Sequence, residues 1–220
     1  MGVAPSIEHV GVLRRLAVDR IIDVGANRGQ FSLACRLTLP NVPIVAFEPI
    51  PKEAAVFREA HKGCQHVQLI EVALGESESS ATLHLSRSAD SSSLLPITQQ
   101  SEYFQQTDEV GTLNVPVKTL DKVSLDWTPS RRQLLKLDVQ GFELKVLQGA
   151  KRFLSECIYV YVECSEVELY EGQALRKEVE SFLGSQGFQR ASRHNELFHK
   201  GELIQADYLF ERTPEATSGP

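Results

Sequence analysis

The chain has 220 residues, of which 42% are hydrophobic and 24% are charged, and it carries a formal net charge of -6. This composition is typical of one soluble globular domain, and the acidic balance argues against a general nucleic-acid binder. The sequence has no run of about 18 apolar residues and no secretory signal pattern, so we expect no membrane span and a cytoplasmic location. The four cysteines form neither a CxxC pair nor a zinc signature, which favours buried thiols in a reducing compartment.

Strand and helix patterns alternate after an N-terminal segment, residues 1–19, in which helical spacing predicts a short helix over 6–17. Buried strands are predicted at residues 20–24, 43–47, 66–74, 132–138 and 158–163, and helices at 29–38, 52–61, 142–154 and 173–184. We expect the helix at 142–154 to be interrupted at Gly149. Residues 188–193 and 205–212 are expected to form a closing antiparallel pair. The alternation predicts an α/β fold with a mainly parallel sheet and helices on both faces.

A polar stretch rich in Ser and Gln, residues 87–114, lies between two short predicted strands at 81–86 and 114–120. Its length is uncommon for a passive connection, and two interpretations remain open, a mobile lid or substrate loop and a disordered insertion. Residues 213–220 are predicted to be a disordered tail. We therefore expect a single domain over residues 1–212.

Four of the predicted parallel strands end in a carboxylate, at Asp23, Glu48, Asp138 and Glu163. In an open parallel sheet, ligands bind outside the carboxyl ends of the strands. A solvated sheet edge also collects acids by chance, but four acids that each follow an apolar run favour a binding crevice.

The segment "DVGANRG" directly follows the first of these strands. Gly25 and Gly29 allow positive φ and close backbone approach, and the next helix presents free N–H groups. A dinucleotide fingerprint requires G-x-G-x-x-G, but Asn27 and Gln30 stand where its second and third glycines would be. This counts against an NAD-linked oxidoreductase. The turn is either a tight connection or a cradle for a small molecule, and Asp23 before it suits a cationic ligand better than a phosphate.

Glu48 stands 23 residues after Gly25. An acid at about this distance, roughly 20 residues, hydrogen-bonds ribose hydroxyls in nucleotide sites. A cofactor that is cationic, bears a ribose and lacks phosphate is S-adenosylmethionine. The two motifs together therefore indicate a site for this cofactor.

The motifs "IIDVGANRGQF", "VAFEPIP", "VALGE", "SSSL", "VKTLDKV" and "LLKLDVQGFELKVLQGA" occur in the order seen in FkbM-type methyltransferases. The chain resembles this family over about residues 20–165 and again in "DYLFER". The resemblance implies a Rossmann-like class I methyltransferase fold and transfer from S-adenosylmethionine to hydroxyl groups of sugars, glycolipids, polyketides and other specialised metabolites. The cofactor-binding positions that it implies are Asp23, Gly25, Ala26, Asn27, Gly29, Phe31, Glu48, Pro49, Glu71, Ala73 and Asp138. Glu71 stands where the family usually has Asn, which leaves its contact to adenine open.

Lys136 and Asp138 point to the same side of their predicted strand, and a buried Lys136 needs an acidic partner, either Asp138 or Asp23. One interpretation is a structural ion pair, and the other places Asp138 beside the transferred methyl group as the general base. Lys136 and Glu163 complete the expected catalytic set. Asp138, Glu143 and Glu163 together are also candidate ligands for a hard cation, although we expect no metal.

Three histidines, His84, His194 and His199, are alternative general bases, and His194 is expected in a turn between the closing strands. Trp127 is interpreted as a packing or surface anchor. The partner that we expect is a small hydroxylated acceptor, and a homodimer is also considered. A protein that binds the cofactor without transferring its methyl group is the competing hypothesis.

Overall fold

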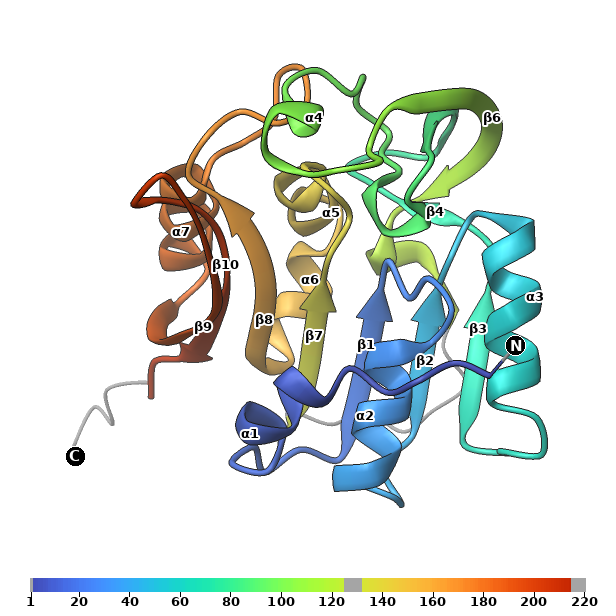
Figure 1. The fold of residues 1–220 in the computed structure, drawn as a ribbon. Helices are drawn as coiled ribbons and strands as arrows, with labels where there is room; N and C mark the ends of the chain where they lie inside the picture. Colours follow the sequence, from blue (N-terminus) through green and yellow to red (C-terminus); the bar gives the residue numbers. More distant parts are fainter. Residues whose placement is uncertain (1, 125–131, 215–220) are drawn as a thin grey trace.

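The computed structural model describes residues 2–124 and 132–214 (Figure 1). Its main sheet has seven strands in the order β3-β2-β1-β7-β8-β10-β9. Their bounds are β1 (Arg20–Val24), β2 (Ile44–Phe47), β3 (Val67–Ile70), β7 (Gln133–Leu137), β8 (Cys157–Ser165), β9 (Phe188–His199) and β10 (Glu202–Arg212). The strands from β3 to β8 pair in parallel, and β10 pairs antiparallel with both β8 and β9. The predicted α/β fold with an antiparallel closing strand is therefore confirmed.

Helices cover both faces of this sheet because alternate strand residues are buried on opposite sides. One face packs against the N-terminal segment and α2 (Gln30–Thr38) through a core that includes Ile21 and Phe31. The other face, which includes Ile22, packs against α5 (Glu143–Gln148), α6 (Lys151–Ser155) and α7 (Arg176–Ser185). The remaining long helix, α3 (Pro51–Ala60), follows β2 and packs over the β3 end of the sheet through Phe57.

The predicted break in the helix after β7 is confirmed, and it separates α5 from α6. A Cβ at Gly149 would lie 2.0 Å from the carbonyl oxygen of Gly75. The chain that leaves β4 (Ala73–Leu74) therefore passes too close for any side chain at this position.

A second sheet of three strands, in the order β4-β6-β5, lies above the carboxyl ends of the parallel strands (Figure 1). It contains β5 (Ser79–Ser86) and β6 (Glu109–Lys118) besides β4. The single strand predicted at 66–74 is thus wrong, because β3 ends at Ile70 and β4 joins the second sheet. The backbone turns between them, where the Val72 N–H donates to the Ile70 carbonyl.

The polar stretch is shorter than predicted because β6 already begins at Glu109. It contains η2 (Ala89–Ser91) and α4 (Gln100–Tyr103), and its apolar side chains pack against Leu169, Tyr170 and Ile204. The stretch therefore has defined structure, and it lies over the carboxyl ends of β7 and β8 (Figure 1).

Several element boundaries differ from the predictions. The N-terminal helix predicted over 6–17 consists of two short turns, η1 (Ile7–His9) and α1 (Val10–Leu13). A further short turn, η3 (Leu120–Lys122), follows β6, and α7 begins at Arg176 rather than 173. His194 lies within β9 and not in a turn, since the β9–β10 turn is at Lys200 and Gly201, which both have positive φ. The predictions for Trp127 and for residues 215–220 lie outside the described residues.

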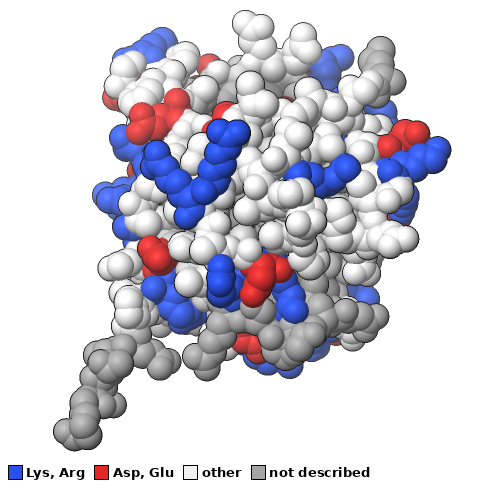
Figure 2. All heavy atoms as spheres, turned by 90° about the horizontal axis from the view of Figure 1, so that it is seen from below, with Lys and Arg blue, Asp and Glu red and all other residues white. Residues whose placement is uncertain are grey.

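In the part of the chain that the structure describes, no helix is long and apolar enough to cross a membrane. Figure 2 shows the face at the amino ends of the parallel strands, where Lys and Arg side chains are interspersed with Asp and Glu side chains among uncharged residues. The four predicted strand-end carboxylates lie at the opposite edge of the sheet.

Candidate active site

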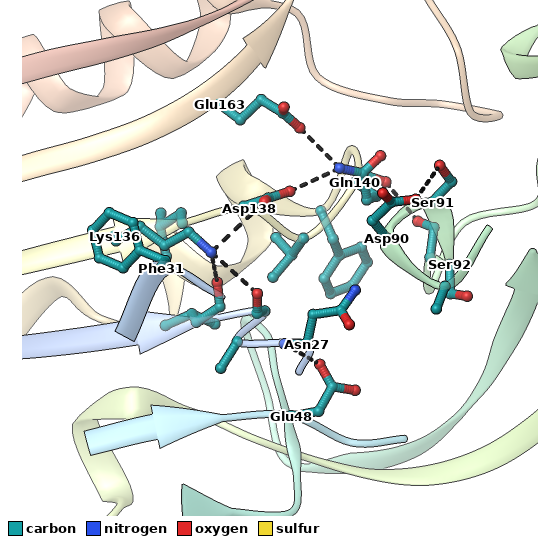
Figure 3. Close-up of a pocket in the computed structure, with 18 of the residues that line it drawn as sticks. Asn27, Phe31, Glu48, Asp90, Ser91, Ser92, Lys136, Asp138, Gln140 and Glu163 are labelled. Atoms are coloured by element: carbon teal, nitrogen blue, oxygen red, sulfur yellow. Dashed lines mark hydrogen bonds and ion pairs between the residues drawn. The ribbon is translucent and has the colours of Figure 1, made fainter. Parts of the chain in front are cut away.

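A cavity of about 640 Å³ opens at the carboxyl ends of β1, β2, β7 and β8 (Figure 3). Its floor comes from the turn after β1, from Glu48 after β2 and from Asp138 after β7. The polar stretch contributes further walls, and so do η1 and the β9–β10 hairpin. The predicted crevice at this edge of the sheet is therefore present.

The turn after β1 packs closely against the end of the neighbouring strand β7. Gly25 has a φ of 74°, and a Cβ there would lie 1.8 Å from the carbonyl oxygen of Asp138. Asn27, with a φ of 48°, lines the cavity and donates its backbone N–H to Glu48 Oε2 over 2.9 Å. Gly29 does not line the cavity, and a Cβ on it would meet the side chains of Phe57 and His61.

Glu48 is 5% exposed and accepts two backbone N–H groups, from Asn27 and, over 2.8 Å, from Ile50. Burial raises the pKa of Glu48 to about 7, although these hydrogen bonds oppose the shift. In Figure 3, Glu48 and Asn27 lie at one end of the cavity, and Glu163, Asp138 and Gln140 lie at the other.

Asp23 is not among the residues that line the cavity, and its place beside a cationic ligand stays a prediction. Its side chain is fully buried, accepts a hydrogen bond from Ser32 Oγ over 2.7 Å, and pairs with Lys136 Nζ at 3.1 Å. Asp23 and Ile21 share the strand face that packs on α2, where Lys136 of the adjacent strand neutralises the carboxylate. Lys136 also lies 3.7 Å from Asp138 Oδ2, so both predicted partners are found. Burial lowers the pKa of Lys136, but Asp23 and Asp138 outweigh it and raise that pKa overall.

The carboxylates of Asp138 and Glu163 are bridged by one side-chain amide. Gln140 Nε2 donates to Asp138 Oδ1 over 2.7 Å and to Glu163 Oε2 over 2.8 Å. Burial, followed by the charge of Asp138, raises the pKa of Glu163 well above its ordinary value. The two carboxyl groups and the Gln140 amide therefore form one connected polar group in the cavity.

Glu143 lies outside the cavity lining. Its Oε1 accepts the backbone N–H groups of Val139 and Gly141, both over 3.1 Å, and closes the turn before α5. Burial raises its pKa to about 7. Among the described residues, no group of three His, Cys, Asp or Glu side chains is close enough to hold a metal ion.

The predicted histidines do not line the cavity. His84 pairs with Glu109 in the second sheet at 2.9 Å, His194 bonds to Ser192, and His199 packs against the ring of Tyr103. Glu71 is also outside the lining, because its carboxylate turns away to form an ion pair with Arg58. The predicted residues that do line the cavity are Gly25, Ala26, Asn27, Phe31, Glu48, Pro49, Ala73, Lys136, Asp138 and Glu163. Ser91–Ser93 of the motif "SSSL" line it as well.

A second polar group of the lining was not predicted. Tyr161 donates its hydroxyl to Asp207 Oδ2 over 3.0 Å, and Asn195 Nδ2 donates to the same oxygen over 2.6 Å. His9 Nδ1 lies 3.1 Å from the Tyr161 hydroxyl. The residues come from η1, β8, β9 and β10, and no local sequence motif connects them. Gln140 was missed as well, although it lies inside the motif "LDVQGFE".

The chain matches known proteins both in sequence and in fold. Residues 23–190 match the family described as "Methyltransferase FkbM domain". The 2-O-methyltransferase NoeI of Sinorhizobium fredii (strain NBRC 101917 / NGR234) is 30% identical over 161 residues, which are 70% of this chain and 66% of NoeI. The methyltransferase sdnD of Sordaria araneosa is 29% identical over 197 residues, 76% of this chain and 73% of that protein. The matched segment thus spans about two thirds of the length of NoeI.

Solved structures share the fold at low identity. The magnesium protoporphyrin IX methyltransferase (ChlM) of Synechocystis PCC 6803 with bound SAM has a TM-score of 0.52 and 10% identity. The match covers 93% of this chain and 76% of that chain. This likeness concerns the arrangement of strands and helices alone.

Proposed function

Because this chain belongs to the FkbM methyltransferase family, whose cofactor is S-adenosylmethionine, we propose that it transfers the cofactor's methyl group to a hydroxyl oxygen of a sugar, glycolipid or specialised metabolite. The observation that carries the proposal is one continuous cavity with a buried carboxylate, Glu48, at one end and the bridged pair Asp138–Glu163 at the other. The first end suits a ribose, and the second suits a hydroxyl group that must lose a proton.

The residues near Glu48 fit the cofactor. A carboxylate has about four lone-pair sites, so Glu48 can accept two ribose hydroxyls besides its two backbone N–H donors. Asn27 Oδ1 is buried and has no hydrogen-bond partner in the described residues, and it lines the same end of the cavity. A ligand with donor groups would satisfy this oxygen. Ile50, Val72 and Phe142 provide an apolar wall for a purine base, which Glu71 does not reach.

When bound, S-adenosylmethionine supplies a methyl group on a positively charged sulfur, which a hydroxyl oxygen displaces in line. The protein contributes mainly by holding the two reactants in alignment, an effect worth roughly 7–11 kcal/mol. The Asp138–Glu163 pair takes up the proton that the hydroxyl loses. Lys136 Nζ lies 3.7 Å from Asp138 Oδ2, so the pair has a cation beside it.

The acceptor end of the cavity has the chemistry for an uncharged polyhydroxylated molecule. His9, Asn195 and Asp207 line it beside Asp138 and Glu163, so donors and acceptors alternate along this wall. Several carboxylates at one end disfavour an acceptor that carries a phosphate or a carboxylate near the methylated hydroxyl.

The test is a transfer assay with S-adenosylmethionine labelled on the methyl group and a panel of sugars, glycolipids and hydroxylated metabolites. Asp138→Asn and Glu163→Gln should each lower kcat by roughly 10²–10⁴-fold while leaving S-adenosylhomocysteine bound. Tight cofactor binding with no transfer to any acceptor would favour the binding-only hypothesis. Transfer to nitrogen on amine-bearing members of the panel, with their hydroxyls unmodified, would contradict O-methylation.

A further inference from the structure

We propose that Gln140 is a positioning residue for methyl transfer, because its side-chain amide holds Asp138 and Glu163 in the arrangement in which the pair takes up the acceptor's proton. The inference rests on the proposed function and assigns a role to a residue that contacts neither reacting atom. Three observations support it: the contacts of the Gln140 side-chain amide, the contacts of the Gln140 backbone, and the charges around Glu163 (Figure 3).

The orientation of the Gln140 amide is determined by its neighbours. Its Nε2 has two hydrogens and two carboxylate oxygens within hydrogen-bond distance, at 2.7 and 2.8 Å. The reversed orientation would place the amide oxygen against two acceptors. On the other side, Oε1 accepts from the hydroxyl of Tyr170 over 2.7 Å. Tyr170 is 1% exposed, so this anchor is fixed in the core.

The backbone of Gln140 is held in an unusual conformation by the polar stretch. Its φ is 54°, a left-handed value that is uncommon for a residue with a side chain. Ser93 Oγ donates to the Gln140 carbonyl over 2.6 Å, and the Tyr170 hydroxyl lies 3.1 Å from the Ser91 carbonyl. Non-glycine residues in such conformations persist where surrounding contacts over-determine them, and they cluster at functional sites.

The charges around Glu163 explain why the amide matters. Three neighbouring acids disfavour a negative charge on Glu163: Asp138 after β7, Asp207 on β10 and Glu143 on α5. The opposing cation is Lys136 on β7. The two N–H groups of Gln140 donate to the ionised carboxylates and stabilise them. Without the donor from Gln140, Glu163 would keep its proton to higher pH. The pair would then act as a base over a narrower range of pH.

The experiment compares Gln140→Leu with wild type in two readouts. Carboxyl-13C NMR of protein labelled at Glu follows the titration of Glu163, whose resonance is assigned by its loss in Glu163→Gln. The midpoint should rise by about one pH unit in Gln140→Leu, and the acid limb of kcat/KM should move to higher pH by the same amount. Affinity for S-adenosylhomocysteine should stay within about twofold, because the cofactor end is untouched.

Gln106→Leu is the matched control, since Gln106 also has a positive φ, 61°, but is exposed and outside the cavity lining. This substitution also places a leucine at a positive φ, and it should leave the midpoint of the Glu163 titration unchanged. If Gln140→Leu does not fold, Tyr170→Phe keeps the amide but removes its anchor, and it should shift the midpoint in the same direction by less. An unchanged midpoint in a folded Gln140→Leu protein overturns the inference, even if activity falls, and leaves the proposed function standing. A wild-type protein that transfers no methyl group overturns both.

Discussion

Glu48 and Glu143 are both buried carboxyl groups with a pKa raised to about 7, yet they have different neighbours. Glu143 is closed within its own turn by two backbone donors, whereas Glu48 faces the cavity. Their folded-state pKa values exceed the unfolded value of about 4.3, so each stabilises the fold most when protonated. That contribution is present at low pH and is lost as the pH rises from about 4.3 to about 7. Our proposal that the cofactor's ribose binds at Glu48 therefore predicts that binding is coupled to the loss of a proton.

We expect the affinity for S-adenosylhomocysteine to fall as the pH drops below about 7, by at most about tenfold per unit. Ribose hydroxyls donate to the ionised carboxylate, so binding at lower pH first requires Glu48 to lose its proton. Isothermal titration calorimetry in two buffers of different ionisation enthalpy measures the affinity and the released proton together. Glu48→Gln should bind more weakly, by roughly tenfold, without the pH slope. Equal slopes in the two proteins would contradict the assignment of Glu48.

Gly25→Ala should destabilise the fold by about 3 kcal/mol or more, because it combines a positive φ with a clash against the strand beside it. The new Cβ would lie 1.8 Å from the Asp138 carbonyl oxygen, so the turn and the end of β7 must separate. Urea unfolding measures the loss. Gly184→Ala in α7, where a Cβ meets nothing within 4 Å, is the control and should stabilise by up to about 1 kcal/mol. Similar unfolding midpoints for both variants would show that the turn relaxes more easily than the structure indicates.

At the scale of elements, β1 and β7 are joined by charge as well as by backbone hydrogen bonds. Asp23 and Lys136 are register partners on the two parallel strands, and their side chains form an ion pair at the face covered by α2. Ion pairs removed from water contribute little net stability, but one partner left alone is costly. The pair therefore makes the alignment of these two strands depend on both residues together.

Lys136→Met should cost about 3–5 kcal/mol of unfolding free energy, because Asp23 would stay buried without its cation. The double variant Asp23→Asn/Lys136→Met should recover most of that loss, and Ser32 Oγ can still bond to the Asn side chain. A double-mutant cycle, with unfolding free energies measured in urea, gives the coupling energy between Asp23 and Lys136. Strictly additive losses from the two substitutions would contradict the pairing.

Most elements of the main sheet were predictable because their signals are local. Apolar runs that end in an acid identified β1, β2, β7 and β8, and Gly149 marked the break before α6. The split between β3 and β4 was not predictable, since "HVQLIEVAL" reads as one strand and only the second sheet separates its halves. The pairing of Asp23 was open for a related reason. The sequence offers two carboxylates to Lys136, and only the packing of α2 determines which one is fully buried.

At the scale of the whole molecule, the two ends of the sheet differ in how charged side chains are arranged. The carboxylates of the cavity gather at the carboxyl ends of the strands, whereas Lys, Arg, Asp and Glu side chains are interspersed on the face at the amino ends (Figure 2). The cavity-lining residues after β1 and β2 come from consecutive βα units, and motif spacing predicted their place at the strand ends. The group of His9, Tyr161, Asn195 and Asp207 could not be predicted from the sequence. Its members come from both ends of the chain and meet only because β10 pairs antiparallel with β8.

Saturating S-adenosylhomocysteine should raise the melting temperature by about 5–10 °C at a concentration of about 100 times its Kd. A ligand that binds only the folded chain stabilises it by about 2.7 kcal/mol under these conditions. Differential scanning fluorimetry with the ligand and, separately, with NAD provides the comparison. A shift with NAD and none with S-adenosylhomocysteine would revive the oxidoreductase hypothesis, for which the glycine turn lacks the required spacing.

Three segments that are distant in the sequence, the N-terminal turn, the polar stretch and the closing hairpin, contribute walls to the cavity. Insertions and exchanges in these segments alter the shape offered to an acceptor while the strand ends beneath keep their spacing. Natural variation within such a scaffold can therefore diversify the molecules that are methylated at little cost to cofactor recognition, and loop grafting offers a direct route to the same result in the laboratory.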